Sequence, residues 1–169
     1  MILVTVGNDL PFSRLVKHAD AWSKDHPDEQ VLAQTGRLRP EDYVPRFMEA
    51  VETLEPEAFE HTCGEAKLLV AHAGMGSIIT ALSTGKPIVI LPRIARLGEH
   101  RNDHQLATAK RFAGRPSLFV AWTEADLPNA IDQALAAPAT SPADRLPQFA
   151  PADFINRLRG YILHNRRPA

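Results

Sequence analysis

The residues best suited to chemistry follow a short apolar run, at positions 72–77. Residues 68–71 predict a buried strand that leads into His72, Ala73, Gly74, Met75, Gly76 and Ser77, where a helix is expected to begin. Two glycines at a strand-to-helix turn let backbone N–H groups approach a ligand, and the helix N-terminus adds free donors. Such a turn suits a diphosphate, with Ser77 as an added donor or as a helix cap. Glycines that serve only to turn the chain are the alternative.

A second polar cluster follows the next apolar run, residues 87–91. Arg93 comes first, and residues 98–105 supply the candidate binding residues Glu99, Asn102, Asp103, His104 and Gln105. A third turn, at Gly7 and Asn8, follows the run 2–6. Because ligands of open α/β sheets bind at the carboxyl ends of the strands, we expect the three turns to face one crevice. A solvated charged loop is the alternative for the second cluster.

These turns require a sheet that brings strand ends together. The apolar runs do not alternate with polar residues, which is typical of strands buried on both faces: 2–6, 68–71, 87–91, 117–121 and, more weakly, 31–34. Helical spacing occurs between them, at 12–22, 78–82, 100–112 and after a capped start at 123–126. Alternating strands and helices predict the α/β class with a Rossmann-like open parallel sheet.

Composition limits the classes of function. The 169 residues are 44% hydrophobic and 23% charged, which predicts one soluble domain. A net charge of −1 argues against a general nucleic-acid binder. The single cysteine, Cys63, excludes an internal disulfide framework. The start lacks a signal-peptide pattern and no apolar run is long enough to span a bilayer, so we expect a cytoplasmic protein.

The C-terminal region has a different composition. We divide the chain into an α/β domain at 1–137, a Pro/Ala-rich linker at 138–151, and an amphipathic helix with a basic tail at 152–169. The apolar residues of this helix share one face: Phe154, Ile155, Leu158, Tyr161 and Ile162. The helix either packs back on its own domain or docks to a partner or an anionic membrane surface.

Other chemistries find weaker support. His100 and His104, four residues apart on an expected helix, need a third ligand to bind zinc. Cys63 is expected to be an inert buried thiol, and Ser77 lacks the motif of a hydrolase nucleophile. We therefore expect no metal and no cofactor.

Five short motifs occur in an order that marks a known family: residues 5–7, 34–36, 72–77, 85–87 and 98–105. Over about residues 1–135 the chain resembles the C-terminal, nucleotide-sugar-binding domain of glycosyltransferase family 28. It looks most like the stand-alone versions, the small subunits of two-component dolichol and exopolysaccharide glycosyltransferases. The resemblance implies the C-terminal half of a glycosyltransferase B fold that binds a UDP-sugar. The diphosphate would lie over residues 74–77, with 102–105 facing the sugar or diphosphate and Arg93 near the nucleotide.

The resemblance also implies a partner, because 169 residues cannot hold the acceptor-binding half. In similar systems a membrane-associated subunit supplies it, and the acceptor is a lipid-linked sugar or polysaccharide. His72 is the candidate catalytic base by position. Thr80 stands where the family usually has a Glu that accepts from the ribose hydroxyls, and Asn8 replaces the more usual Thr. A non-catalytic nucleotide-sugar-binding or assembly protein is the alternative function. A nucleotide-sugar epimerase is disfavoured, because it needs two domains in one chain.

Overall fold

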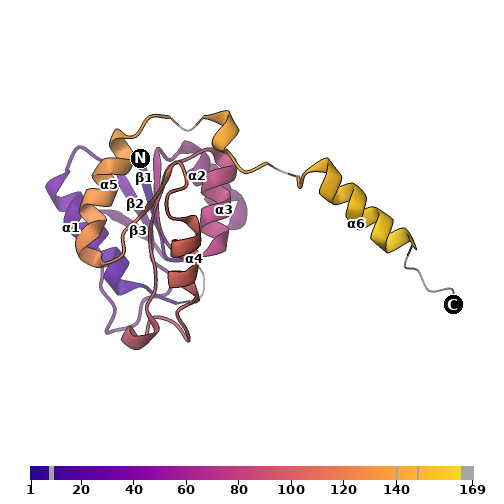
Figure 1. Ribbon diagram of the computed structural model, residues 1–169. Coiled ribbons are helices and arrows are strands. Elements are labelled where there is room, and N and C mark those ends of the chain that lie inside the picture. Colours follow the sequence, from indigo (N-terminus) through magenta and orange to yellow (C-terminus); the bar gives the residue numbers. More distant parts are fainter. Residues whose placement is uncertain (8–9, 140, 148, 165–169) are drawn as a thin grey trace.

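A six-stranded, all-parallel sheet forms the centre of the molecule. The computed structural model describes residues 1–7, 10–139, 141–147 and 149–164 (Figure 1). The sheet has the order β3-β2-β1-β4-β5-β6. Its strands are β1 (Ile2–Thr5), β2 (Val31–Gln34), β3 (Glu49–Val51), β4 (Leu68–His72), β5 (Ile88–Leu91) and β6 (Leu118–Val120). Successive strands are added outward from β1 to β3 on one side and from β4 to β6 on the other, so the strand order reverses between β1 and β4, where Ile2 pairs with Leu68. The predicted open parallel sheet is confirmed, and this reversal is where such folds bind ligands.

Helices cover both faces of the sheet (Figure 1). On one face, α1 (Ser13–Asp25) and α5 (Leu127–Ala136) pack on residues such as Val4 and Val70. On the other, α2 (Pro56–Glu65), α3 (Met75–Thr84) and α4 (His104–Phe112) pack on residues such as Leu3 and Leu69. Successive strand residues therefore enter opposite cores, which explains why the strand segments are apolar without alternation.

Local chemistry sets several helix ends. The expected capped start is confirmed, because Thr123 and Asp126 form a reciprocal capping box ahead of α5. Pro56 begins α2, where its missing N–H costs nothing. Helix α3 ends at Gly85, whose φ of +71° lies in the left-handed region that favours glycine.

Two parts of the sequence prediction need correction. The predicted helix 100–112 begins only at His104, because residues 100–103 form a bend, so His100 and His104 do not share a helix face. Strand β3 and helix α2 were not predicted. β3 is a three-residue edge strand with two exposed residues, and α2 buries only Cys63, so neither has a strong hydrophobic pattern.

The C-terminal region leaves the domain from the side of α3. Within 138–151, the N–H of Leu146 donates to the carbonyl of Leu82 at 3.1 Å, which ties this segment to the end of α3. Helix α6 (Ala152–His164) then extends away from the domain (Figure 1). Its apolar side chains are exposed, so α6 is not packed back on the part of its domain that the structure describes. None of the described helices combines the length and the apolar character needed to cross a membrane.

Candidate functional site

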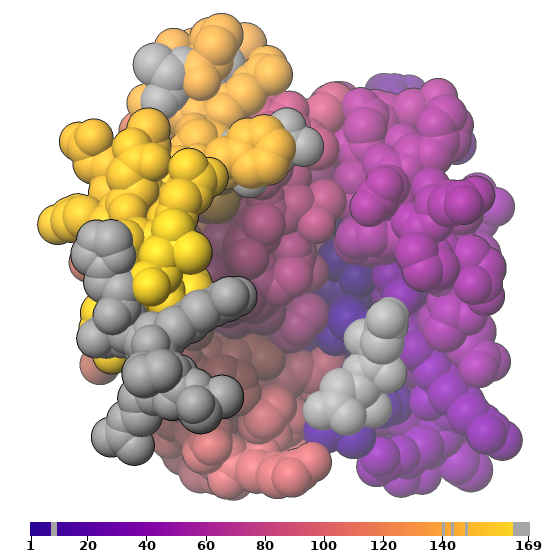
Figure 2. Space-filling view, turned by 90° about the vertical axis from the view of Figure 1, so that its right-hand side faces the viewer, coloured from indigo at the N-terminus to yellow at the C-terminus, as the bar shows by residue number. Residues whose placement is uncertain are grey.

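A cleft of about 700 Å³ opens between α2 and α3 at the carboxyl edge of the sheet. Its lining residues are Thr5, Gly7, Gln34, Thr53, Leu54, Glu55, Pro56, Phe59, Glu60, His72, Gly76, Ser77 and Thr80. Figure 2 looks onto this side of the molecule and shows the hollow, with indigo N-terminal atoms at its floor. The volume lies within the usual range for small-molecule sites.

The glycine turn forms one wall of this cleft. Gly74 is the N-cap of α3, with φ −86° and ψ 141°, and its carbonyl accepts the first helical hydrogen bond from the N–H of Ile78 at 3.2 Å. The amides of residues 75–77 thus belong to the first turn, which has no acceptors within the helix. Ser77 lies inside this turn and is 7% exposed, so the alternative that Ser77 caps the helix is wrong. The turn presents N–H donors and a positive dipole end to the cleft.

His72 is packed between two glycine turns. A Cβ added at Gly7 would lie 2.7 Å from Cε1 of His72, and one added at Gly74 would lie 2.8 Å from Cδ2 and Cε1. Gly7 also has φ +77°, and its N–H donates to Oγ1 of Thr5 at 3.2 Å. Gly7 and Gly74 can approach the imidazole this closely because glycine has no side chain.

The imidazole of His72 is neutral at pH 7. Burial, and next the positive charge of Arg93, lower the pKa of His72 from 6.5 to about 4; His100 and His104 act in the same direction. Its Nδ1 is buried and has no hydrogen-bond partner among the described residues. A neutral imidazole with this pKa accepts a hydrogen bond readily, but it is a weak general base at neutral pH.

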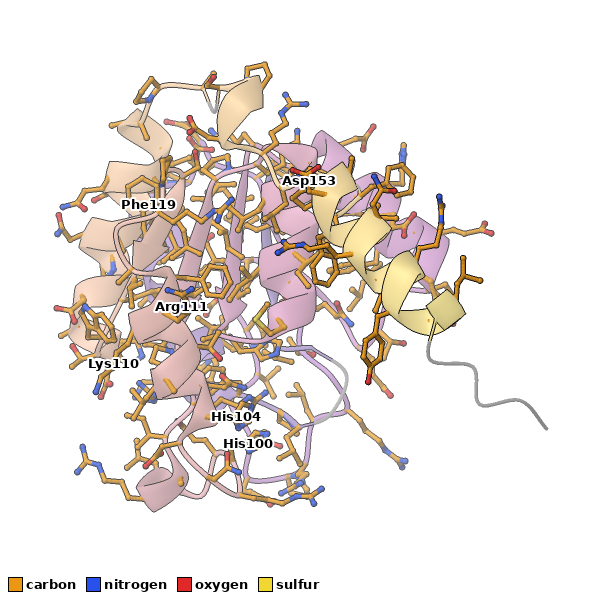
Figure 3. The ribbon with its side chains drawn as sticks, turned by 45° about the vertical axis from the view of Figure 1, so that its right-hand side comes forward. His100, His104, Lys110, Arg111, Phe119 and Asp153 are labelled. Atoms are coloured by element: carbon orange, nitrogen blue, oxygen red, sulfur yellow. The ribbon has the colours of Figure 1, made fainter. Side chains whose placement is uncertain are left out.

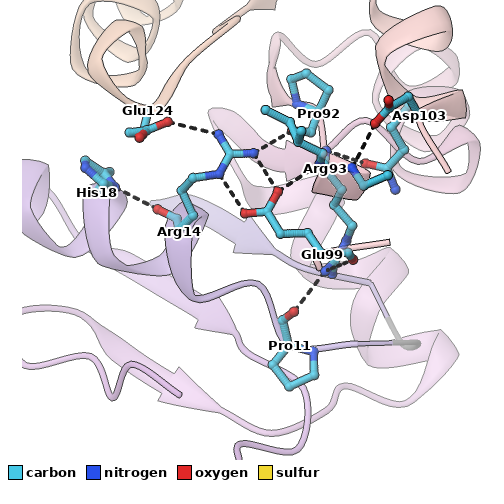
Figure 4. Close-up of polar contacts among 11 residues, drawn as sticks. Pro11, Arg14, His18, Pro92, Arg93, Glu99, Asp103 and Glu124 are labelled. Atoms are coloured by element: carbon cyan, nitrogen blue, oxygen red, sulfur yellow. Dashed lines mark hydrogen bonds and ion pairs between the residues drawn. The ribbon is translucent and has the colours of Figure 1, made fainter. Parts of the chain in front are cut away.

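Arg93 is almost fully buried and holds the adjoining loops together (Figure 4). Its guanidinium donates to the carbonyls of Val6, Leu10, Pro11 and Glu99 at 2.5–3.3 Å. It also stacks on the ring of Phe12, 4.5 Å from the centroid. Four carbonyls around one cation account for its burial, and they make Arg93 a structural support of the site edge.

Glu99 has internal partners as well (Figure 4). Its two carboxylate oxygens each accept from Arg14 at 2.7 Å, and one also accepts from the N–H of Ile94 at 2.8 Å. Arg14 reaches further to Glu124 and to the carbonyl of Pro92. This network fixes the segment that follows β5 against α1.

The remaining residues of the second cluster lie at the start of α4. Gln105 is buried and accepts the N–H of Arg93 at 3.1 Å, and Asp103 accepts the N–H of Ala95 at 2.8 Å. Asn102 hydrogen-bonds to His104, whose ring meets that of His100 edge to face at 4.4 Å (Figure 3). In the part of the chain that the structure describes, no three His, Cys, Asp or Glu side chains group around a metal position.

The structure thus brings together some predicted residues and adds others. Gly7, His72, Gly76, Ser77 and Thr80 line the cleft, with Ala73, Gly74 and Met75 in the adjoining turn. Asn8 lies outside the described residues. Sequence reasoning missed the wall formed by Thr53, Leu54, Glu55, Pro56, Phe59 and Glu60. Pro56 as a possible first helical residue, with Phe59 and Cys63 four residues apart, is the weak local pattern that could have indicated this wall.

Comparisons with known proteins agree on the fold. The model of the glycosyltransferase family 28 C-terminal domain matches residues 1–158. No curated protein matches the chain. CalG4, the calicheamicin glycosyltransferase, is similar in structure, with TM-score 0.63 and 19% identity over 99% of this chain and 43% of that one. The glycotransferase of kitacinnamycin gives TM-score 0.62 and 21% identity over 81% of this chain and 35% of that one. The solution structure of ALG13 gives TM-score 0.57 and 17% identity over 93% of both chains. The chain therefore spans less than half of the first two and nearly all of the third.

Proposed function

Because the chain belongs to glycosyltransferase family 28, whose C-terminal domain it carries, we propose that it is the donor-binding subunit of a UDP-sugar-dependent glycosyltransferase. The observation that carries this proposal is the position of the first turn of α3. This turn follows Gly74 and borders the cleft, and the cleft lies where the strand order of the sheet reverses. Free N–H donors at that position suit the diphosphate of a nucleotide sugar.

We assign the nucleoside to the wall that residues 53–56 form with Thr80. Among the described residues that line the cleft, the charged side chains are Glu55 and Glu60. Because both of these side chains are acidic, the favourable interaction with the negatively charged diphosphate comes from the backbone amides and the dipole of α3. His100 and His104 influence His72 electrostatically, and this interaction makes them candidates to bind the sugar or diphosphate. Fixed donors and a helix dipole stabilise a departing UDP without further groups.

The acceptor half is assigned to a separate membrane-associated subunit, and the acceptor to a lipid-linked sugar or a polysaccharide. The chain covers 43% of CalG4 but 93% of ALG13, which supports a stand-alone half. Binding to that subunit would hold the chain at the cytoplasmic face of the membrane. His72 is the proposed catalytic group, as a neutral imidazole that accepts a hydrogen bond from the acceptor hydroxyl: His72→Ala should abolish transfer and retain UDP binding. Unchanged transfer would exclude it.

One observation favours a second candidate, a non-catalytic nucleotide-sugar-binding or assembly protein. Thr80 lines the cleft at the position where the family resemblance implies a carboxylate for the ribose. Loss of one charge-assisted hydrogen bond costs about 1.5–3 kcal/mol, roughly 10- to 100-fold in affinity. Sugar transfer by the chain together with its partner subunit would rule this candidate out.

Calorimetric titration with UDP, with GDP as the control nucleotide, tests the proposal. We expect the chain to bind UDP selectively, and Thr80→Glu to tighten that binding at least about tenfold. Thr84→Glu is the matched control, because it adds the same charge to α3 one turn away, outside the cleft. Failure to bind either nucleotide, both alone and with the co-purified partner, would refute the proposal.

A further inference from the structure

Helix α6 presents a continuous apolar face that the other described residues do not cover. The exposed fractions on this face are 51% for Phe154, 36% for Ile155, 48% for Leu158, 68% for Tyr161 and 53% for Ile162. At about 100° per residue, these five positions fall within a sector roughly 120° wide. An exposed apolar surface of this kind marks an interaction site.

Charge is distributed around this face in a definite way. At the same helical spacing, Arg157 borders one side of the apolar sector and Arg159 borders the other. Asp153, the one acidic residue of α6, lies on the far side with Asn156 and Gly160. Leu163 departs from the pattern, since it also lies on the far side. Arginines on both borders can reach outward along a lipid surface while the apolar sector enters it.

The segment also differs from the rest of the chain in net charge. Residues 152–169 contain four arginines and one aspartate, a net charge of +3. The whole chain carries −1, which leaves −4 on residues 1–151. An anionic surface therefore attracts this segment and repels the domain, and the charge asymmetry favours lipid over an uncharged protein groove.

We propose that α6 lies flat on an anionic lipid surface, with its apolar face inserted and Arg157 and Arg159 at the headgroups. The attachment point suits this arrangement, because the segment before α6 is tied to the C-terminal end of α3 through Leu146 and Leu82. The cleft lies at the opposite, N-terminal end of α3. Attachment through α6 therefore leaves the cleft at the other end of α3 from the point of attachment.

Co-sedimentation of the full chain with vesicles tests this proposal. We expect binding to vesicles of phosphatidylcholine mixed with phosphatidylglycerol, and none to phosphatidylcholine alone. Each basic side chain near an anionic surface contributes about fivefold, so Arg157→Gln with Arg159→Gln should weaken binding about 25-fold. The matched control is Lys110→Gln with Arg111→Gln, which removes the same charge from exposed positions on α4 (Figure 3) and should change binding little.

A second pair of variants tests the apolar face. Leu158→Asn with Ile162→Asn should abolish sedimentation, and both side chains are exposed, so the domain remains folded. In a Tyr161→Trp variant, tryptophan emission should shift to the blue when anionic vesicles are added. Equal binding to both lipids, or equal losses in the α4 control, would overturn the proposal. It would also be overturned if the chain self-associates through α6 and the apolar variants abolish that association while vesicle binding is unchanged.

Discussion

Replacement of Gly74 by alanine tests the packing of His72 against the glycine turn. The φ and ψ of Gly74, −86° and 141°, are accessible to alanine, so the backbone opposes the change little. The added Cβ would instead overlap the imidazole, with Cδ2 and Cε1 at 2.8 Å. Overpacking of this size costs about 1–3 kcal/mol. At about 2–4 °C per kcal/mol for a chain of this length, the melting temperature should fall by roughly 2–12 °C.

A double-mutant cycle in urea isolates this contact. In the His72→Ala background the methyl group added at position 74 has space, so Gly74→Ala should be neutral or stabilising, with a coupling energy of about 1–3 kcal/mol. Gly76→Ala is the control, because its Cβ meets nothing within 4 Å, and it should stabilise α3 by about 0.5–1 kcal/mol. If Gly74→Ala costs the same free energy of unfolding in both backgrounds, the imidazole contact is not the cause.

Three groups give the remaining predictions: Arg14 and His72, which are partly buried, and Cys63, which is fully buried. Arg14→Met removes the bidentate partner of the Glu99 carboxylate and should lower the free energy of unfolding in urea by about 3 kcal/mol; a smaller loss in Arg14→Met with Glu99→Gln would confirm the ion pair as the cause. Because the pKa of His72 falls from 6.5 to about 4 on folding, the unfolded chain binds that proton more tightly. Stability should therefore decline as the pH drops from about 6.5 to about 4, by at most roughly 3 kcal/mol, and His72→Asn should lose that dependence in thermal melts. Burial raises the pKa of Cys63 to about 11, so the thiol should resist a disulfide reagent until urea unfolds the chain; rapid labelling of the native chain would contradict its burial.

Strands β1, β4 and β5 and the glycine turns that follow β1 and β4 were predictable, because the residues of these strands are buried on both faces of the sheet. The continuous apolar runs 68–71 and 87–91 are not typical of loops and therefore predict strands. Gly74 comes shortly after the first of these runs in the sequence. Helix α2 was not predictable in the same way, since Cys63 is its single buried residue. Prediction from the sequence therefore missed the wall of the cleft that residues 53–60 form.

The roles of charged residues in the second cluster were the hardest to predict. Arg93 and Glu99 have the residue types of ligand contacts, but their partners come from α1 and from the loop before it, far away in the sequence. Asp20 illustrates the same point, because a carboxylate inside an amphipathic helix is fully buried. It accepts the hydroxyl of Tyr43 and the N–H groups of residues 46–48. Long-range pairing of this kind leaves no local pattern.

The central position of β1 has a consequence for how the chain is made. β1 leaves the ribosome before the other five strands of this sheet, and it pairs with β2 on one side and with β4 on the other, Leu3 with Leu69. Until residues 68–72 emerge, one edge of β1 is an open row of amides and carbonyls beside apolar side chains. The β1–β2–β3 half must therefore wait for the second half. A pause in translation before β4 should expose the nascent chain to aggregation more than a pause after it.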